Sequence, residues 1–333
     1  MSHSLRTAGL SRPTLERETE GLTMKKTIAI LAAAALLGAC AKKDISPDEV
    51  RAAMPKPADI QVGSPKAANP GALTVEDAVT IPAEFALDSY YVALTFNLNS
   101  WAILTLVQVI TAFPPTECTA DQCTWGPWKD DNNAQVSWRM VVKRDGDGYS
   151  YVLGAHAAAA TDFTPILSGH AFPGADGRHG QGDFVLDLDA SKTVQPTKDD
   201  HGKLSVTYDN RTFLKLTALF TGAKNSDPAG PAYLDIAYDF EESATGGDLQ
   251  FMFQGVGTSK NLSLATRWVT GGEGRGDAKY VETGASHTAS QCWAGNAGGF
   301  VLEYQIVDAV TMVGSNDACA PFGTPVYSTL TLP

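Results

Sequence analysis

The chain has 333 residues and a formal charge of −12 at pH 7, with 25 Lys and Arg residues against 37 Asp and Glu residues. Hydrophobic residues make up 44% of it, an ordinary globular proportion that excludes wholesale disorder. An acidic chain without a basic block repels phosphate backbones. The composition therefore excludes nucleic acid as a partner.

A short basic and apolar segment near the N-terminus has the organisation of an export signal. Residues 24–26 read MKK, and an apolar run of 13 residues, Thr27–Ala39, follows them. That run is too short to cross a bilayer as a helix. It leads into the sequence LGAC at residues 37–40. The segment resembles the lipobox signal of bacterial lipoproteins.

This resemblance implies that residues 24–39 are a signal peptide and that Cys40 is lipidated and becomes the mature N-terminus. Acyl chains such as palmitate would then attach the protein to a membrane, and stable attachment takes more than one chain. Because Ala and Lys, not Asp, follow the cysteine, the resemblance implies sorting to the outer membrane, facing the periplasm or the cell surface. We interpret the polar residues 1–23 as a misassigned leader.

Four further cysteines follow in the exported chain, and an even number there indicates two disulfides. Three pairings are open, and proximity in the sequence favours Cys118 with Cys123 and Cys292 with Cys319. A zinc site is the alternative. The C-x4-C spacing of the first pair and the wide spacing of the second are unlike a zinc ribbon, so disulfides are the better interpretation.

Residues 40–71 are expected to form a lipidated tether that contains one short helix. Ser46 is a suitable N-cap, Pro47 suits the first helical turn, and Pro55 ends the helix. The prolines and small residues that follow indicate a semi-stiff spacer. A single β-rich domain is expected over residues 72–333.

Two elements are predicted at the start of this domain. Tyr90–Asn97 is predicted to be a strand. Trp101–Phe113 is predicted to be a helix that Asn99 or Ser100 caps and Pro114 ends, although its β-branched residues leave a strand open. This helix is apolar on almost all sides, so we expect other elements to enclose it.

Alternation of apolar and polar residues dominates the rest of the chain. Two such runs flank an Asp-Gly turn at residues 145–148 and predict a hairpin. Runs with one apolar and one wetter face are typical of antiparallel strands. Glycine-rich stretches between them, such as Gly272–Asp277, are expected to be loops. The other alternating runs lie at residues 184–188, 204–208, 214–220, 234–240, 249–254, 262–268 and 300–306.

We therefore predict a mainly β fold, in which a curved antiparallel meander or incomplete barrel surrounds the Trp101–Phe113 helix. A two-sheet β-sandwich is the alternative. The polar outward face argues against a membrane barrel. This architecture generally resembles that of uncharacterised Gram-negative lipoproteins and is distantly similar to the open barrels of the lipoprotein-localisation type, whose apolar interior accepts acyl chains. The likeness assigns no site residues.

Catalytic chemistry has little support in the sequence. Nucleophile elbows, Walker loops and metalloprotease motifs are absent in a credible form, so we expect a non-enzymatic protein without a cofactor. His170, His179 and Asp176 could meet across a hairpin and hold zinc or copper. Their spacing is not diagnostic, and we therefore predict no metal site.

These features predict a membrane-anchored exported lipoprotein that acts as a non-enzymatic binding or structural module. One alternative is a periplasmic carrier or chaperone for an apolar ligand such as lipid, which requires a cavity beside the Trp101–Phe113 helix. A second alternative is a hydrolase, which requires converging Asp and His side chains. The expected partners are the membrane, through the lipid on Cys40, and a protein partner or apolar ligand.

Overall fold

The computed structural model describes residues 44–65, 81–129, 135–175, 180–197, 199–225, 230–282, 284–296 and 299–333. Asp44–Pro333 forms one compact unit. The signal peptide, Cys40 and residues 1–23 lie outside the described residues, so the expectations about them stay predictions.

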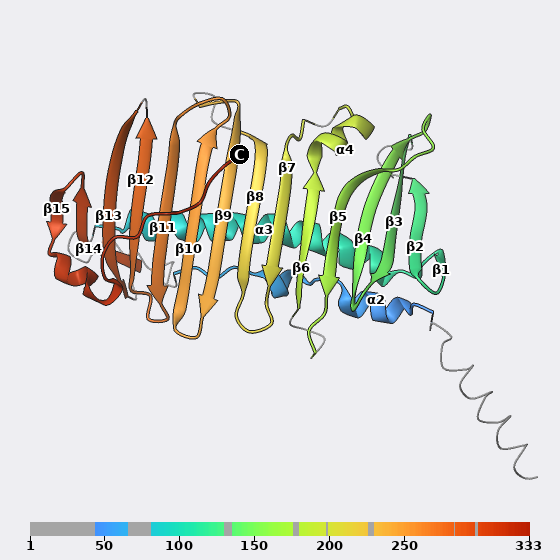
Figure 1. Ribbon diagram of the computed structural model, residues 1–333, viewed down its shortest axis with the longest axis horizontal. Helices are drawn as coiled ribbons and strands as arrows, with labels where there is room; N and C mark the ends of the chain where they lie inside the picture. The colour runs from blue at the N-terminus through green and yellow to red at the C-terminus, as the bar shows by residue number, and fades with distance from the viewer. Residues whose placement is uncertain are drawn as a thin grey trace, which may run out of the picture. The chain divides into compact units, whose positions relative to one another are not determined.

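A single antiparallel sheet of 15 strands, counted within the described residues, forms the body of this unit (Figure 1). Each strand pairs with its neighbours in chain order, and the sheet is open, with β1 and β15 at its two edges. The predicted mainly β meander is confirmed, and the alternative of a two-sheet sandwich is wrong. The strands are β1 Glu117–Cys118, β2 Gln122–Lys129, β3 Val136–Asp145, β4 Gly148–Ala157, β5 Thr164–Phe172, β6 Gln181–Asp187, β7 Lys203–Asp209, β8 Lys215–Lys224, β9 Tyr233–Ser243, β10 Gly246–Gly255, β11 Asn261–Val269, β12 Gly274–Glu282, β13 Ala285–Asn296, β14 Gly299–Val307 and β15 Val310–Gly314.

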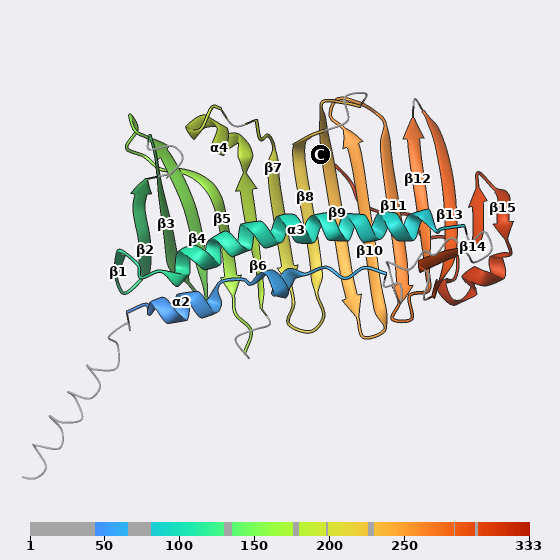
Figure 2. The ribbon, with the colours of Figure 1, turned by 180° about the vertical axis from the view of Figure 1, so that it is seen from behind.

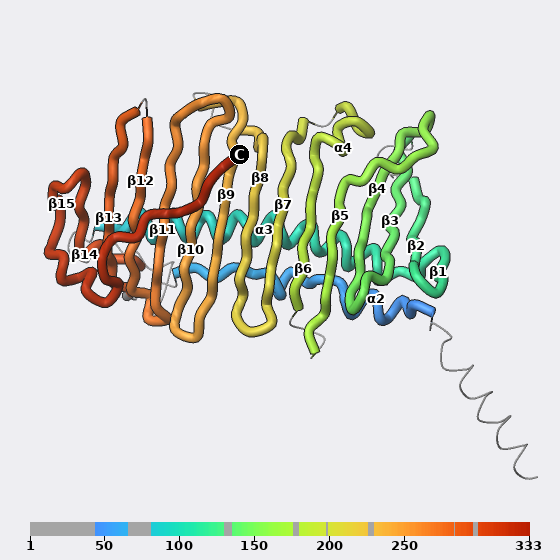
Figure 3. The backbone as a smooth tube through the Cα atoms, in the orientation of Figure 1, coloured from blue at the N-terminus to red at the C-terminus, as the bar shows by residue number. Residues whose placement is uncertain are grey.

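The two faces of the sheet are covered by different segments. The long helix α3 crosses the strands on one face (Figure 2), and the C-terminal segment crosses part of the opposite face (Figure 3). The predicted hairpin at residues 145–148 joins β3 to β4, where Asp145 pairs with Gly148. The described helices are α2 Pro47–Ala53, η2 Pro57–Ile60, α3 Glu84–Ala112, α4 Leu188–Val194 and η3 Asn316–Phe322.

Helix α3 has 29 residues and extends well beyond the predicted helix. It includes Tyr90–Asn97, so the prediction of a strand there is wrong. Asn99 and Ser100, the expected caps, lie within the helix. The prediction that Trp101–Phe113 is helical is confirmed, but only its C-terminal end agrees to within one residue, where the following prolines end the helix as expected.

The local sequence does not predict where α3 starts, because a residue of a distant strand accepts the hydrogen bond that a capping side chain normally accepts. Ala83 occupies the N-cap position and has no side chain that can cap the helix. Instead, the Phe85 amide donates to the Gln291 side-chain oxygen of β13 at 3.0 Å. A partner 206 positions away satisfies a donor that is usually capped within the same turn.

The short helix α2 forms where it is predicted and helps to end α3. The Ser46 hydroxyl accepts from the Asp48 amide at 3.2 Å, and the Ser46 amide donates to Glu49 at 3.4 Å, which completes a capping box. Arg51 then donates to two C-terminal carbonyls of α3, those of Thr111 at 3.2 Å and Ala112 at 3.1 Å. These carbonyls have no partner within the helix.

The expected tether is part of the folded unit over residues 44–65. The Asn97 side chain of α3 accepts from the Val62 amide at 2.8 Å and donates to the Val62 carbonyl at 2.9 Å. These two bonds fix the segment against the helix. Apolar side chains from the segment also enter the main core: Ile45, Val50, Met54, Ile60 and Val62.

Two cysteine pairs are bonded in the pattern that sequence proximity favours. Cys118 and Cys123 join β1 to β2, with their Cα atoms 4.1 Å apart. Cys292 of β13 joins Cys319 of η3 across 5.5 Å. The second bond fixes the C-terminal helix to the sheet.

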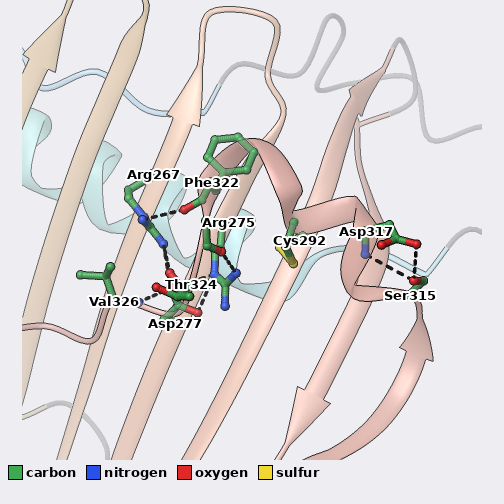
Figure 4. Close-up of a disulfide and its surroundings, with 11 residues drawn as sticks. Arg267, Arg275, Asp277, Cys292, Ser315, Asp317, Phe322, Thr324 and Val326 are labelled. Carbon is green, nitrogen blue, oxygen red and sulfur yellow. Dashed lines mark hydrogen bonds and ion pairs between the residues drawn. A yellow bond between two sulfur atoms is a disulfide. The ribbon is translucent and has the colours of Figure 1, made fainter.

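A buried charge cluster holds the C-terminal segment beside this second disulfide (Figure 4). The Arg275 guanidinium lies 2.9 Å from the Asp277 carboxylate and donates to the Gly323 carbonyl at 2.6 Å. Asp277 also accepts from the Val326 amide at 2.9 Å. The loop expected over Gly272–Asp277 is therefore wrong from Gly274 onward: these residues begin β12, because the tail supplies partners for their charges.

Candidate apolar ligand-binding groove

Small residues bring the first turns of α3 directly onto the sheet. The Ser89 hydroxyl lies 2.8 Å from the Thr266 hydroxyl of β11, and both residues are buried. A Cβ atom at Gly276 of β12 would lie 2.8 Å from the Cβ atom of Phe85, so only glycine permits this approach. The helix and sheet are in contact at β11 and β12.

Farther along α3, a cavity of about 580 Å³ separates the helix from β6–β10. We call it the central groove. Its volume lies within the range of about 300–1,000 Å³ that small-molecule sites occupy. Aliphatic and aromatic side chains make up most of its wall. The lining residues are Tyr91, Val92, Thr95, Phe96, Asn99, Ser100, Ala102 and Ile103 of α3, with Leu186, Leu188, Asp200, Leu204, Ala218, Phe220, Ile236, Tyr238, Phe251 and Phe253.

The alternating runs of the sequence explain the apolar floor of the central groove. Residues two apart in a strand point to the same face. Tyr238 of β9 therefore shares a face with its cross-strand partners Ala218 and Phe251, and Ile236 shares it with Phe220 and Phe253. The sequence identifies all of these positions as apolar rows, although it does not show that they face a cavity.

Several polar groups interrupt the apolar wall, and two of them are buried hydroxyls without a partner within the described residues. Tyr238 is 5% exposed and Ser100 is 2% exposed. The Tyr238 phenol and the Ser100 hydroxyl have no hydrogen-bond partner within the described part of the chain. The Phe96 ring stacks on Tyr238 at 5.1 Å between centroids, one helical turn before Ser100. Burial, followed by the nearby Asp239, raises the pKa of Tyr238 far above its ordinary value, so the phenol stays neutral.

Sequence reasoning did not identify these two hydroxyls as site residues. Tyr238 belongs to an alternating apolar row, and Ser100 resembles a helix cap. Their shared location depends on how α3 crosses the sheet, and no local signal in the sequence reports that crossing.

Two further cavities flank α3. One, of about 860 Å³, lies at the C-terminal end of the helix between Phe113 and the indoles of Trp125, Trp128 and Trp138. The other, of about 720 Å³, lies between α3 and the segment around η2, and Leu98 and Trp101 line it. Apolar surface therefore borders the helix along much of its length.

Several large apolar side chains of α3 are exposed to solvent. Leu98 is 61% exposed and Trp101 is 58% exposed, and Tyr91, Val109 and Phe113 are exposed as well. We call these five residues the outer row. Among the described residues, α3 is the one helix whose length and composition would allow it to cross a membrane, a test that the core helix of a soluble protein also passes.

The weak metal candidates are not brought together in the part of the chain that the structure describes. His170 Nδ1 lies 3.0 Å from Asp183, and its Nε2 lies 3.9 Å from Asp145. Asp176 and His179 lie outside the described residues. Within those residues, no group of three or more His, Cys, Asp or Glu side chains is placed to hold a metal ion.

Comparisons of the chain with protein-family models, curated proteins and solved structures find no match. The geometry of the central groove is therefore the basis for inferring a function.

Proposed function

We propose that this protein is a membrane-anchored, non-enzymatic carrier that binds an apolar ligand in the central groove. The observation that carries the proposal is the cavity of about 580 Å³ between α3 and the sheet, with its aliphatic and aromatic wall. Moving a methylene group from water into such a site contributes about 0.8 kcal/mol. A hydrocarbon chain that fills the groove therefore gains a favourable binding free energy without any catalytic group.

The membrane attachment rests on the lipobox resemblance at Cys40. Three residues separate Cys40 from Asp44, where the folded unit begins. A fully extended chain spans at most about 14 Å over four residues. An acyl anchor on Cys40 would thus keep α2, and the C-terminal end of α3 that Arg51 contacts, close to the membrane.

The outer row supports exchange of an apolar ligand with that membrane. Exposed apolar residues that cluster on one surface mark contacts with a membrane, a partner or a ligand. Leu98 and Trp101 belong both to the outer row and to the wall of a cavity beside α3. Such a surface gives a hydrocarbon chain an apolar route between bilayer and protein. We place the protein at the outer membrane, facing the periplasm or the cell surface.

Native mass spectrometry of the exported protein tests the carrier function. We expect an apolar adduct that denaturation releases, or uptake of the fluorophore N-phenyl-1-naphthylamine if the adduct is lost during purification. Ala218→Trp fills the groove and should reduce uptake at least tenfold, whereas Thr217→Trp, on the opposite face of β8, should not. A bare mass without uptake would contradict the carrier function and favour a protein partner.

A further inference from the structure

We propose that the central groove selects a neutral acyl ester over a bare hydrocarbon or a fatty-acid anion. This inference rests on the proposed function and specifies its ligand class. The hydroxyls of Ser100 and Tyr238 carry it, because they have no partner within the described residues and belong to residues of a mostly apolar wall.

Buried polar atoms normally have partners, because leaving a donor without one forfeits the free energy of its lost hydrogen bonds to water. A ligand with a hydrogen-bond acceptor beside Tyr238 and Ser100 would replace the hydrogen bonds to water that these groups lose on burial. A hydrocarbon would not replace them. Discrimination of this kind is strong when a site contains polar groups that only one ligand can satisfy.

The one charge among the described lining residues disfavours an anionic acceptor. Asp200, which is exposed, lines the cavity, and no Lys, Arg or His is among its described lining residues. A carboxylate ligand would be desolvated near Asp200 without a cation to balance it. An ester carbonyl accepts a hydrogen bond without bringing a charge. The neutral Tyr238 phenol and the Ser100 hydroxyl can donate such bonds. Because both oxygen atoms are almost fully buried in this structure, their side chains must shift toward the ligand to form them.

Competition against N-phenyl-1-naphthylamine with the full chain tests this selection. The competitors are methyl dodecanoate, pentadecane and dodecanoate at neutral pH. The double variant Ser100→Ala/Tyr238→Phe should weaken binding of the ester about three- to tenfold, the usual effect of losing a hydrogen bond. It should not weaken binding of pentadecane. Tyr208→Phe is the matched control, because Tyr208 is a buried tyrosine of the same core that does not line the groove.

A measurement on the wild-type protein keeps the inference testable if the double variant does not fold. The infrared carbonyl stretch of ¹³C-labelled methyl dodecanoate should fall to a hydrogen-bonded frequency on binding. Three results would each overturn the inference while the groove remains a binding site. The first is a carbonyl stretching frequency typical of a hydrocarbon solvent. The others are equal weakening of ester binding and alkane binding in the double variant, and tighter binding of dodecanoate than of the ester. If no competitor displaces the fluorophore and the fluorophore itself does not bind, the proposed carrier function fails.

Discussion

Individual charged residues inside the sheet depend on one another. Asp277 is fully buried, and Arg275 is 1% exposed. Removing one partner of a buried pair leaves an uncompensated charge, which costs about 3–5 kcal/mol. We expect Asp277→Ala to lower the free energy of unfolding by that amount in urea denaturation and to release the C-terminal segment that Val326 joins to the carboxylate.

An exposed ion pair provides the control for this prediction. Arg211 lies 2.5 Å from Asp209 at the surface. Because such pairs contribute about 0–1 kcal/mol, Asp209→Ala should leave the unfolding midpoint nearly unchanged. Equal losses in the two variants would show that burial of the Arg275–Asp277 pair does not determine its contribution.

The pKa of Asp239 predicts how stability depends on pH. Partial burial, followed by repulsion from Glu241, raises the pKa of this carboxyl above its ordinary value. The folded protein therefore takes up a proton at a higher pH than the unfolded chain does. The contribution of Asp239 to stability is unfavourable at neutral pH and becomes less so as the pH falls through the raised pKa toward the ordinary value of about 3.9.

Asp239→Asn removes this charge at every pH. The variant should be more stable than the wild type at pH 7, and the difference should shrink as the pH falls toward 4. Urea denaturation at a series of pH values measures both curves. A constant offset between them would contradict the role of the carboxyl charge.

At the scale of elements, the sequence predicts the strands that alternate clearly between apolar and polar residues. The alternating runs locate β3, β4, β6–β11 and β14, which form most of the sheet. The short edge strands β1 and β15, together with β2, β5, β12, β13 and the first half of α3, are missed. The first half of α3 resembles a strand because it contains β-branched and aromatic residues, and β12 and β13 lack alternation because Arg275, Asp277 and Gln291 are buried by distant partners.

The contact between α2 and α3 carries a prediction at this scale. Arg51 donates to the Thr111 and Ala112 carbonyls, and its side chain is 44% exposed. Hydrogen bonds to a charged group contribute about 1.5–3 kcal/mol when buried, so solvent screening reduces the expected loss for Arg51→Ala to about 1 kcal/mol. Chemical denaturation measures this loss.

Asp48→Asn is the matched control for Arg51→Ala. It removes the charge of the 3.0 Å ion pair between Asp48 and Arg51 but keeps the bonds from Arg51 to α3. We expect a change below about 0.5 kcal/mol, as for other exposed pairs within a helix. If Asp48→Asn costs as much as Arg51→Ala, the ion pair and not the cap of α3 is the stabilising contact.

At the scale of the whole unit, the candidate site arises because the distance between α3 and the sheet changes along the helix. Small residues hold α3 on β11 and β12, and larger side chains farther along leave the central groove over β6–β10. The sequence predicts an apolar helix beside apolar strands. It does not predict the path of α3, because that path depends on Gly276 and Gln291, which are distant in the chain.

The outer row carries a prediction about the membrane. If α3 faces the bilayer, the exposed Trp101 should enter the acyl region of vesicles that contain brominated lipids, and its fluorescence should be quenched. The protein has six tryptophans, so the quenching is assigned by difference. Trp101→Phe should remove most of it, whereas Trp293→Phe should not, because Trp293 is 2% exposed within the sheet.

Leu98 provides an independent measure of the same contact. Burying a leucine side chain contributes about 1.5–3 kcal/mol, so Leu98→Asp should weaken vesicle binding of the unlipidated chain by about tenfold or more. Leu98 lines the cavity near η2 and not the central groove, so uptake of N-phenyl-1-naphthylamine should persist in this variant. If Leu98→Asp leaves vesicle binding unchanged and the two tryptophan variants show equal quenching, the outer row does not contact the bilayer. The ligand would then reach the groove from solution or from a protein.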